Sequence, residues 1–195
     1  MDVMNTACTP HPQALHILFK HKRKVLNVFS DVIGINEIDH ISIACITHSN
    51  EVIFLSHTPS IEYRLMASNL LPYDLLLTPH FYTNDHSKLW SELYHPEKYV
   101  ELHAIKQAKE RFTAGFSIPI KWHGIHLVYS FATKAPRAHS DLLLTRQDEL
   151  INIGHYCFNK LSDLVLPHTQ SQERTRQHLT LVVNNTRSIH HAAST

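Results

Sequence analysis

The chain has 195 residues, which is enough for one substantial hydrophobic core and too few for two full domains. Its 18 Lys and Arg residues nearly balance its 17 Asp and Glu residues, and a net charge of +1 provides no strong overall field for nucleic acid or an anionic membrane. Three widely separated cysteines without CxxC spacing, no secretory signal and no run long enough to span a membrane together predict a cytoplasmic protein without membrane contact.

Residues 1–12 are expected to form a flexible N-terminus ahead of a domain that covers residues 13–166. The domain opens with a predicted amphipathic helix over residues 13–33, where apolar side chains recur at helical spacing, and Gly34 is suited to end it. The basic run at residues 20–24 belongs on the solvated face of this helix, although such a run could also touch phosphate or an acidic partner.

Two β-rich runs follow, at residues 41–47 and 52–55, and the four polar residues between them fit the turn of an antiparallel hairpin. Apolar side chains occur on both faces of these runs, which is typical of central strands that are covered on both sides. Thr58 and Pro59 then match the N-cap and the first position of a helix that we predict over residues 60–70.

Residues 73–85 form an aromatic-rich connection that is too apolar to remain in water, so we expect it to fold over a pocket or the core. Two further helices are predicted over residues 87–94 and 97–111, separated by Pro96.

The segment of residues 112–134 has the pattern of two amphipathic strands joined by a tight turn. Alternation places Phe116 on a core face and Ser117 on the opposite face, which could line a cavity. Gly115 and Pro119 are unfavourable in a central ladder, so we expect this strand to be bulged or close to an edge of the sheet.

The last predicted helix starts near Thr145, where Thr-Arg-Gln-Asp offers a capping box. Its buried stripe is predicted to be Leu150, Ile153, Cys157, Leu161 and Leu164. Residues 167–195 are polar and poor in aromatic residues, and we expect a flexible tail there.

In combination, these elements predict an α/β (α+β) fold, an α-β-α sandwich with a central antiparallel sheet. The chain resembles the autoinducer-binding domain of the LuxR family of quorum-sensing regulators and, more distantly in architecture, GAF and PAS domains. The resemblance rests on GFSIPI at residues 115–120, which precedes YSFATK, and on HTPSIEY at residues 57–63, which looks like the Tyr-Pro-x-x-Trp stretch of the family's pocket helix.

This resemblance implies a non-enzymatic sensor domain with a pocket for a small amphipathic ligand, of the acyl-lactone or fatty-acid kind, and no cofactor. Ala67 stands where the family has a tyrosine, and Leu76 where it has an acidic residue, with Asp74 two places early. These departures put an acyl-lactone in question. The candidate pocket residues are Tyr63, Tyr73, Asp74, Trp90, Ser117 and Tyr129. Each aromatic one among them could equally be ordinary core.

Two functions therefore stay open: a ligand sensor, or a protein-interaction module that pairs with itself or with a full-length regulator. Family regulators also carry a C-terminal helix-turn-helix, which the residues after Leu166 are too few to form, so no direct DNA binding is expected. Gly115 to Pro119 lacks the second glycine of a nucleophile elbow, and the 18 histidines lack metal-ligand spacing. No catalytic residue and no metal site are predicted.

Overall fold

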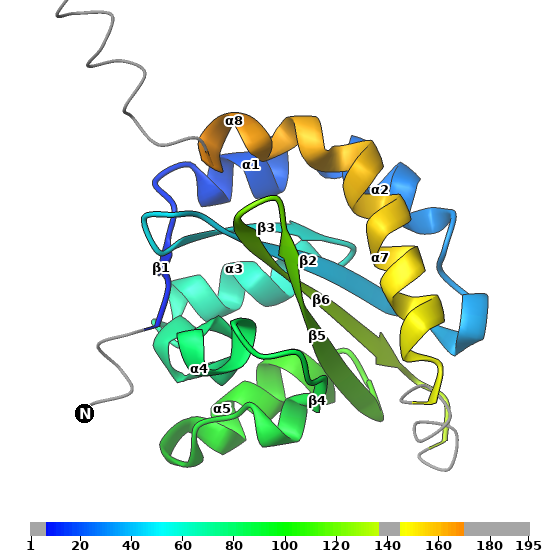
Figure 1. Ribbon diagram of the computed structural model, residues 1–195. Helices are drawn as coiled ribbons and strands as arrows, with labels where there is room; N and C mark the ends of the chain where they lie inside the picture. The colour runs from blue at the N-terminus through cyan, green and yellow to red at the C-terminus, as the bar shows by residue number, and fades with distance from the viewer. Residues whose placement is uncertain (1–6, 137–144, 170–195) are drawn as a thin grey trace, which may run out of the picture.

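Two antiparallel hairpins form the centre of a six-stranded sheet with the order β1-β3-β2-β6-β5-β4 (Figure 1). The computed structural model describes residues 7–136 and 145–169. The strands are β1 (Thr9–Pro10), β2 (His40–Ile46), β3 (Glu51–Ser56), β4 (Lys88–Leu89), β5 (Ala114–Trp122) and β6 (Ile125–Thr133). Both predicted hairpins are confirmed, and the sheet is antiparallel apart from the two-residue parallel pair of β1 and β3 at one edge.

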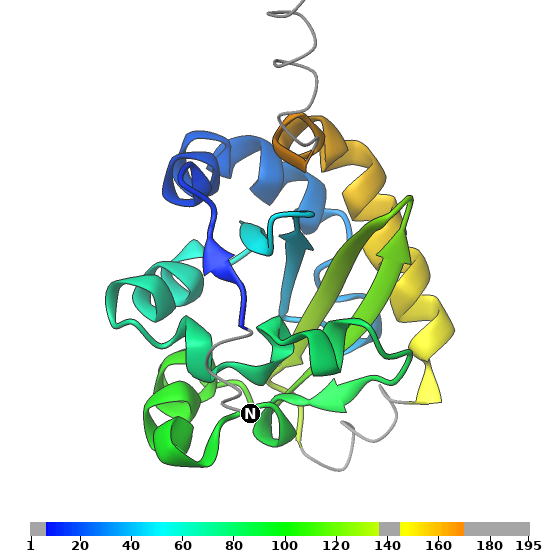
Figure 2. The ribbon, with the colours of Figure 1, turned by 60° about the vertical axis from the view of Figure 1, so that its left-hand side comes forward.

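Helices cover both faces of the sheet, as Figures 1 and 2 show. One face packs against α2 (Lys22–Ser30) and α7 (Gln147–Leu161), and the other against α3 (Pro59–Ala67), α4 (Pro79–Tyr82) and α5 (Tyr99–His103). The predicted α-β-α sandwich is therefore confirmed. Short 3₁₀ turns lie between these helices and strands: η2 (Ile35–Glu37), η3 (Leu71–Tyr73), η4 (Leu75–Leu77), η5 (Trp90–Glu92), η6 (Pro96–Lys98) and η8 (Ser162–Leu164).

The β5–β6 hairpin has an uninterrupted register of nine residue pairs, from Ala114–Thr133 to the turn. His123 and Gly124 make the turn with φ of 44° and 87°, the left-handed conformations that a two-residue hairpin turn requires. The outer neighbour of β5 is β4, which has only two residues. Of the two alternatives predicted for this strand, the structure has the position near an edge.

The helix predicted over residues 13–33 is in fact two helices, α1 (Ala14–Lys20) and α2, which meet at His21 with φ −99° and ψ 9°. Helix α1 contacts the hydrophobic clusters on both faces of the sheet: Leu18 packs with the cluster on the α3 side, and Ile17 with the cluster on the α7 side. Phe29 of α2 packs with the cluster on the α7 side.

The helix predicted over residues 87–94 is wrong. Lys88 and Leu89 instead pair with Ser117 and Phe116 of β5, and a single 3₁₀ turn, η5, follows. Residues 97–111 are helical, as predicted, but α5 continues into a π-helical turn, η7 (Ala104–Ala108), which turns two polar side chains of that segment into the protein.

Residues 7–12 pack against the sheet, which corrects the prediction that all of residues 1–12 form a flexible N-terminus. Cys8 is buried, and β1 pairs with the start of β3. Residues 1–6, 137–144 and 170–195 lie outside the described part, so the predicted tail is described only as far as Thr169, which ends α8 (Leu166–Thr169). Among the described helices, none combines the length and apolar character that a membrane span requires.

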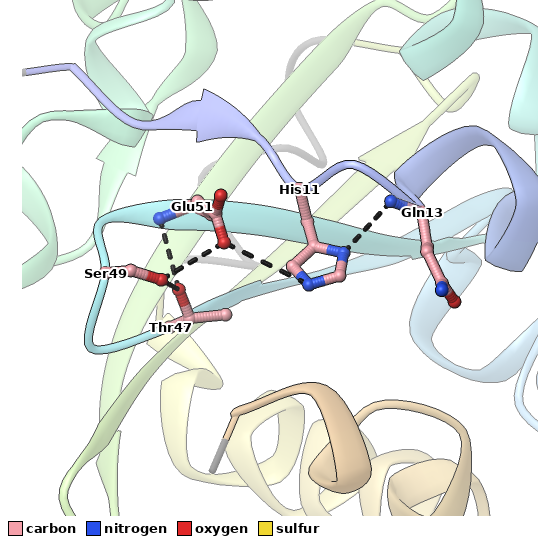
Figure 3. Close-up of polar contacts among 5 residues, drawn as sticks. All are labelled: His11, Gln13, Thr47, Ser49 and Glu51. Atoms are coloured by element: carbon pink, nitrogen blue, oxygen red, sulfur yellow. Dashed lines mark hydrogen bonds and ion pairs between the residues drawn. The ribbon is translucent and has the colours of Figure 1, made fainter. Parts of the chain in front are cut away.

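Polar contacts tie the segment before α1 to the β2–β3 hairpin (Figure 3). The Glu51 amide donates to Thr47 Oγ1 at 3.2 Å, and the Ser49 hydroxyl donates to Glu51 Oε2 at 3.1 Å. His11 Nε2 lies 4.0 Å from Glu51 Oε2, while its Nδ1 accepts from the Gln13 amide at 3.1 Å. The carboxylate therefore links the hairpin turn to the start of the domain.

Candidate functional site

A group of buried polar side chains lies between the sheet and the cover formed by α3 and the segments that follow it. They surround a cavity of about 20 Å³, which has room for about one water molecule. Its polar lining comes from His40, Ser42, Glu62, Asp74, Lys106 and Ser130. Its apolar lining comes from Ala44, Phe54, Ile61, Leu65, Leu76 and Trp90.

An ion pair between Lys106 and Asp74 forms one wall of the cavity. Lys106 Nζ lies 2.6 Å from Asp74 Oδ2, and both side chains are 3 % exposed or less. The ammonium also lies 4.6 Å from the ring centroid of Trp90 and 5.4 Å from that of Tyr94, within the range of cation–π attraction. Such a buried pair depends on both partners, because either charge left alone would remain desolvated and uncompensated.

Trp90 is held in place by strand β5. Its indole lies against Gly115, where a Cβ atom would come within 2.3 Å of the ring. Its Nε1 donates to Ser117 Oγ at 3.1 Å, and Ser117 Oγ lies 2.7 Å from Ser130 Oγ on the neighbouring strand. The glycine that weakens the strand is therefore the residue that admits the indole.

Glu62 and Asp74 each present an oxygen without a partner among the described residues. Both Glu62 Oε2 and Asp74 Oδ1 are buried, and within residues 7–136 and 145–169 neither oxygen meets the geometric criteria for a hydrogen bond. Burial raises the pKa of Glu62 to about 7, against the opposing effects of the Ser56 hydroxyl, Lys106 and the Ser42 hydroxyl. Burial also raises the pKa of Asp74, although Lys106 opposes it. The cavity wall thus offers two carboxyl oxygens that can form hydrogen bonds with a further group.

His40 contributes a neutral ring to the same wall. Burial is the main reason that its pKa falls to about 3, with His57 and Lys106 adding smaller effects in the same direction. Its Nδ1 lies 3.1 Å from Thr58 Oγ1. This contact involves the hydroxyl of the threonine that the sequence predicts as the N-cap of α3. No side-chain cap bond forms at α3.

The structure brings three of the six predicted pocket residues together. Asp74 and Trp90 line the cavity, and Ser117 holds Trp90 from the strand. Tyr73 lies in η3 and contacts the ring of His95, with centroids 5.7 Å apart, and it is not among the cavity-lining residues.

The other two lie elsewhere. Tyr63 is on the outer side of α3, 47 % exposed, with its ring 5.8 Å from that of Phe19. Tyr129 points to the opposite face of the sheet, where its hydroxyl lies 2.9 Å from His155 Nδ1 of α7. Both predictions are corrected: alternation along β6 directs Tyr129 away from the cavity, and helical rotation places Glu62 rather than Tyr63 on the inner face of α3.

Sequence reasoning missed Glu62, Lys106, His40 and Ser130. Glu62 could have been found, because it stands three residues before the apolar Leu65 on the inward face of a helix. Lys106 gives no such signal, because its neighbours in the sequence have the pattern of a solvent-exposed helix. The π-helical turn η7 is what directs its side chain inward.

Residue types that could form a nucleophilic relay are present but are not connected. Ser117 is bonded to Trp90 and Ser130, His40 to Thr58, and Asp74 to Lys106. In the described ranges, no group of three or more His, Cys, Asp or Glu side chains is placed to hold a metal ion. The arrangement is a cluster of buried polar side chains around a small cavity in the core.

The α-β-α sandwich is similar in fold to the autoinducer-binding domain of a solved regulator structure. Among solved structures, the chain is similar to a crystal structure of Escherichia coli SdiA, a LuxR-family quorum-sensing regulator, with a TM-score of 0.55 and 16% identity over 89% of this chain and 79% of that chain. It is also similar to SdiA in complex with octanoyl-rac-glycerol, with a TM-score of 0.50 and 16% identity over 91% and 73% of the two chains.

At this level of identity the likeness shows a shared fold, and it confirms the predicted resemblance at that level. No protein-family model matches the sequence, and a comparison with curated protein sequences finds no match.

Proposed function

We propose that this chain is a non-enzymatic, cytoplasmic regulatory domain that binds a small amphipathic molecule between its sheet and the cover formed by α3 and residues 71–108. The observation that carries the proposal is the pair of buried, unpartnered oxygens, Glu62 Oε2 and Asp74 Oδ1, in the wall of a cavity. Buried polar atoms are normally satisfied, so two such atoms beside one cavity are suited to a polar head group.

The shared fold supports this proposal, because SdiA forms a complex with octanoyl-rac-glycerol, an amphipathic molecule. The present cavity of about 20 Å³ is far below the roughly 300 Å³ of ordinary ligand sites. A ligand tail therefore has to move the cover away from the sheet. The cover is suited to this movement because residues 71–108 consist of short turns and helices rather than one long element.

Ligand binding would act by mass action. A molecule that binds only the native state stabilises that state, and a molecule that moves the cover selects one arrangement of α3 relative to the sheet. Regulation then requires a partner that binds more tightly to one of the two arrangements of α3, the one with ligand or the one without it.

Thermal unfolding of the full chain with a panel of acyl-lactones, fatty acids and monoacylglycerols tests the proposal. At least one class is expected to raise the unfolding temperature in a saturable manner. Ala44→Leu, which fills the cavity, should abolish the shift, whereas Ala67→Leu on the exposed side of α3 should retain it. A panel without any shift, or an equal shift in both variants, would count against a ligand in this cavity.

One observation favours a second candidate function, pairing with another protein. Leu15 and Phe19 of α1 and Tyr63 of α3 are 44 %, 46 % and 47 % exposed, and together they form an apolar patch. We propose that this patch supports homodimers or heterodimers with a full-length regulator. Sedimentation of the wild-type chain should show a dimer that Phe19→Ser weakens and that the distant, exposed Val100→Ser does not. A monomer at all concentrations would exclude the homodimer.

A further inference from the structure

A second, larger cleft lies at the end of the sheet where the two central hairpins turn, and we call it the turn cleft. Its volume of about 480 Å³ is within the range of roughly 300–1,000 Å³ that is usual for small-molecule sites. Its polar lining comes from Thr47, His48, Asn50, Tyr82, Thr83 and His126. Among the described residues, none lines both this cleft and the cavity between the sheet and α3, so the turn cleft is a separate site.

Three segments of the chain build the turn cleft. The β2–β3 turn places His48 beside Gly124 of the β5–β6 turn, where an added Cβ atom would lie 3.8 Å from the His48 ring. Helix α4 contributes Tyr82, whose ring centroid lies 5.0 Å from that of His126 on β6. Two imidazoles and a phenol ring therefore line one cleft.

Most polar groups of the turn cleft already have partners within the protein. The Thr83 hydroxyl donates to the Pro79 carbonyl at 2.6 Å, and the Tyr82 hydroxyl donates to Asn50 Oδ1 at 3.1 Å. The hydroxyl of Thr47 is engaged within its own hairpin turn (Figure 3). The two imidazoles are the polar groups that remain for a ligand.

The surroundings of His126 decide which kind of ligand its ring can meet. Its Nδ1 is buried and has no hydrogen-bond partner among the described residues. Burial is the main cause of the lowered pKa of His126, and Lys121 and His48 lower that pKa further, whereas a hydrogen bond with the Tyr82 backbone opposes them. No aspartate or glutamate is among the described residues that line the cleft. An anion would therefore supply the negative charge that a protonated ring lacks here.

We infer that the turn cleft binds a small aromatic carboxylate, whose anionic group is held by the imidazoles of His48 and His126 and whose ring lies against Tyr82. The His126 ring rotates about its Cβ–Cγ bond to present Nδ1 to the ligand. Hydrogen bonds from charged imidazoles to a carboxylate are stronger than those between neutral groups, and Lys121 repels a cationic ligand. This inference goes beyond the function proposed above and is independent of it, because the two sites use different residues.

The affinity for such an anion should rise as the pH falls, because the anion stabilises the protonated imidazoles. The groups that face His126 are Lys121 of β5, His48 of the β2–β3 turn and Tyr82 of α4. Lysine side chains are charged throughout pH 6 to 8, and Tyr82 is neutral there because burial raises its pKa to about 12. Only the two histidines of this group therefore change charge in that range.

The test titrates the full wild-type chain calorimetrically with 2-naphthoate at pH 6 and pH 8, beside three matched probes: 2-naphthamide, 2-naphthylmethylamine and acetate. At pH 6, 2-naphthoate is expected to bind about tenfold or more tightly than each of the other three, and about threefold or more tightly than it does at pH 8. Binding of the amide, the amine or acetate as tightly as 2-naphthoate overturns the inference. An affinity for 2-naphthoate that does not change with pH, or no detectable binding of it, overturns the inference as well.

Three variants assign the binding to the turn cleft. His48→Gln and His126→Gln each remove one imidazole and should weaken the binding of 2-naphthoate at pH 6 about threefold or more. His86→Gln, at an exposed histidine that is not among the lining residues, should bind as the wild type does. Because His48 is exposed in a turn, its replacement still decides the matter where His126→Gln fails to fold, which thermal unfolding checks. An unchanged affinity in either folded variant would overturn the inference.

Discussion

Lys106 Nζ and Asp74 Oδ2 lie 2.6 Å apart inside the protein, although the two residues are 32 positions apart in the sequence. The ion pair joins the π-helical turn η7 to the connection that follows α3, and it closes one side of the cavity. The cover over the sheet is therefore held together by a charge pair as well as by apolar packing.

Lys106→Met is expected to destabilise the fold by about 3–5 kcal/mol, because it leaves the Asp74 carboxylate buried without its partner. The double variant with Asp74→Asn should lose less than the sum of the two single changes. Urea unfolding measures all three free energies. Lys98→Met, at an exposed ion pair, is the control and should change little. A loss in Lys106→Met no greater than in the control would show that the buried pair does not stabilise the cover.

Gly115→Ala is expected to destabilise the protein by about 1–3 kcal/mol, since the new Cβ would come within 2.3 Å of the Trp90 indole. The cause can be isolated by repeating the change in a Trp90→Leu background, where the smaller side chain should leave room for it. An equal loss of stability on Gly115→Ala in the wild-type and the Trp90→Leu backgrounds would contradict a clash with the indole. Unfolding followed by far-UV circular dichroism provides the measurement without dependence on tryptophan fluorescence.

The pH dependence of stability should report the environment of Glu62. Burial raises its pKa from 4.5 to about 7, so the unfolded chain loses this proton near pH 4.5 while the native state holds it until about pH 7. The stability associated with Glu62 is therefore fully present below pH 4.5 and is lost as the pH rises through 7.

Glu62→Gln removes this titration and keeps the other groups that face it, namely His40, Asp74 and Lys106. His40 has a lowered pKa and changes stability in the opposite direction below pH 6.5, so only the difference between variant and wild type isolates Glu62. From pH 5 to pH 8, that difference should move by about 3 kcal/mol in favour of Glu62→Gln. Parallel stability curves for the two proteins would refute the raised pKa.

Tyr63→Ser should leave ligand affinity unchanged, because Tyr63 lies on the outer side of α3, against Phe19. Asp74→Asn, at the cavity wall, is expected to weaken binding of any ligand that the wild type accepts. Calorimetric titration of the two variants with the same ligand distinguishes the positions. If Tyr63→Ser weakened ligand binding as much as Asp74→Asn does, Tyr63 would have to be part of the binding site.

The sandwich was predictable because its central strands carry strong local patterns. Alternation through Phe116 and Ser117 assigns the two faces of β5 correctly, and the tight turn at Gly124 agrees with the hairpin register. The β4 segment was not predictable in this way, because its strand character comes from pairing with Ser117 and Phe116 and not from its own residues.

The candidate site was predictable only in part. Asp74 was a candidate because it lies two places before the acidic position of the family that the chain resembles, and Trp90 was one of the candidate aromatic residues. Lys106 enters the cavity through a π-helical turn that no local pattern in the sequence marks. Tyr63 was misassigned because an aromatic residue near a helix start suits either side of the helix. The neighbouring Glu62 takes the inner position because its carboxyl finds Ser56 and Ser42 there.

Mass spectrometry of the small molecules released when the purified full-length chain is denatured tests the central claim most directly. The account predicts about one equivalent of a small amphiphile, retained by the wild type and missing from Ala44→Leu. A natively folded wild-type chain that releases no amphiphile, or that releases the same amount as Ala44→Leu, would contradict a ligand in this cavity.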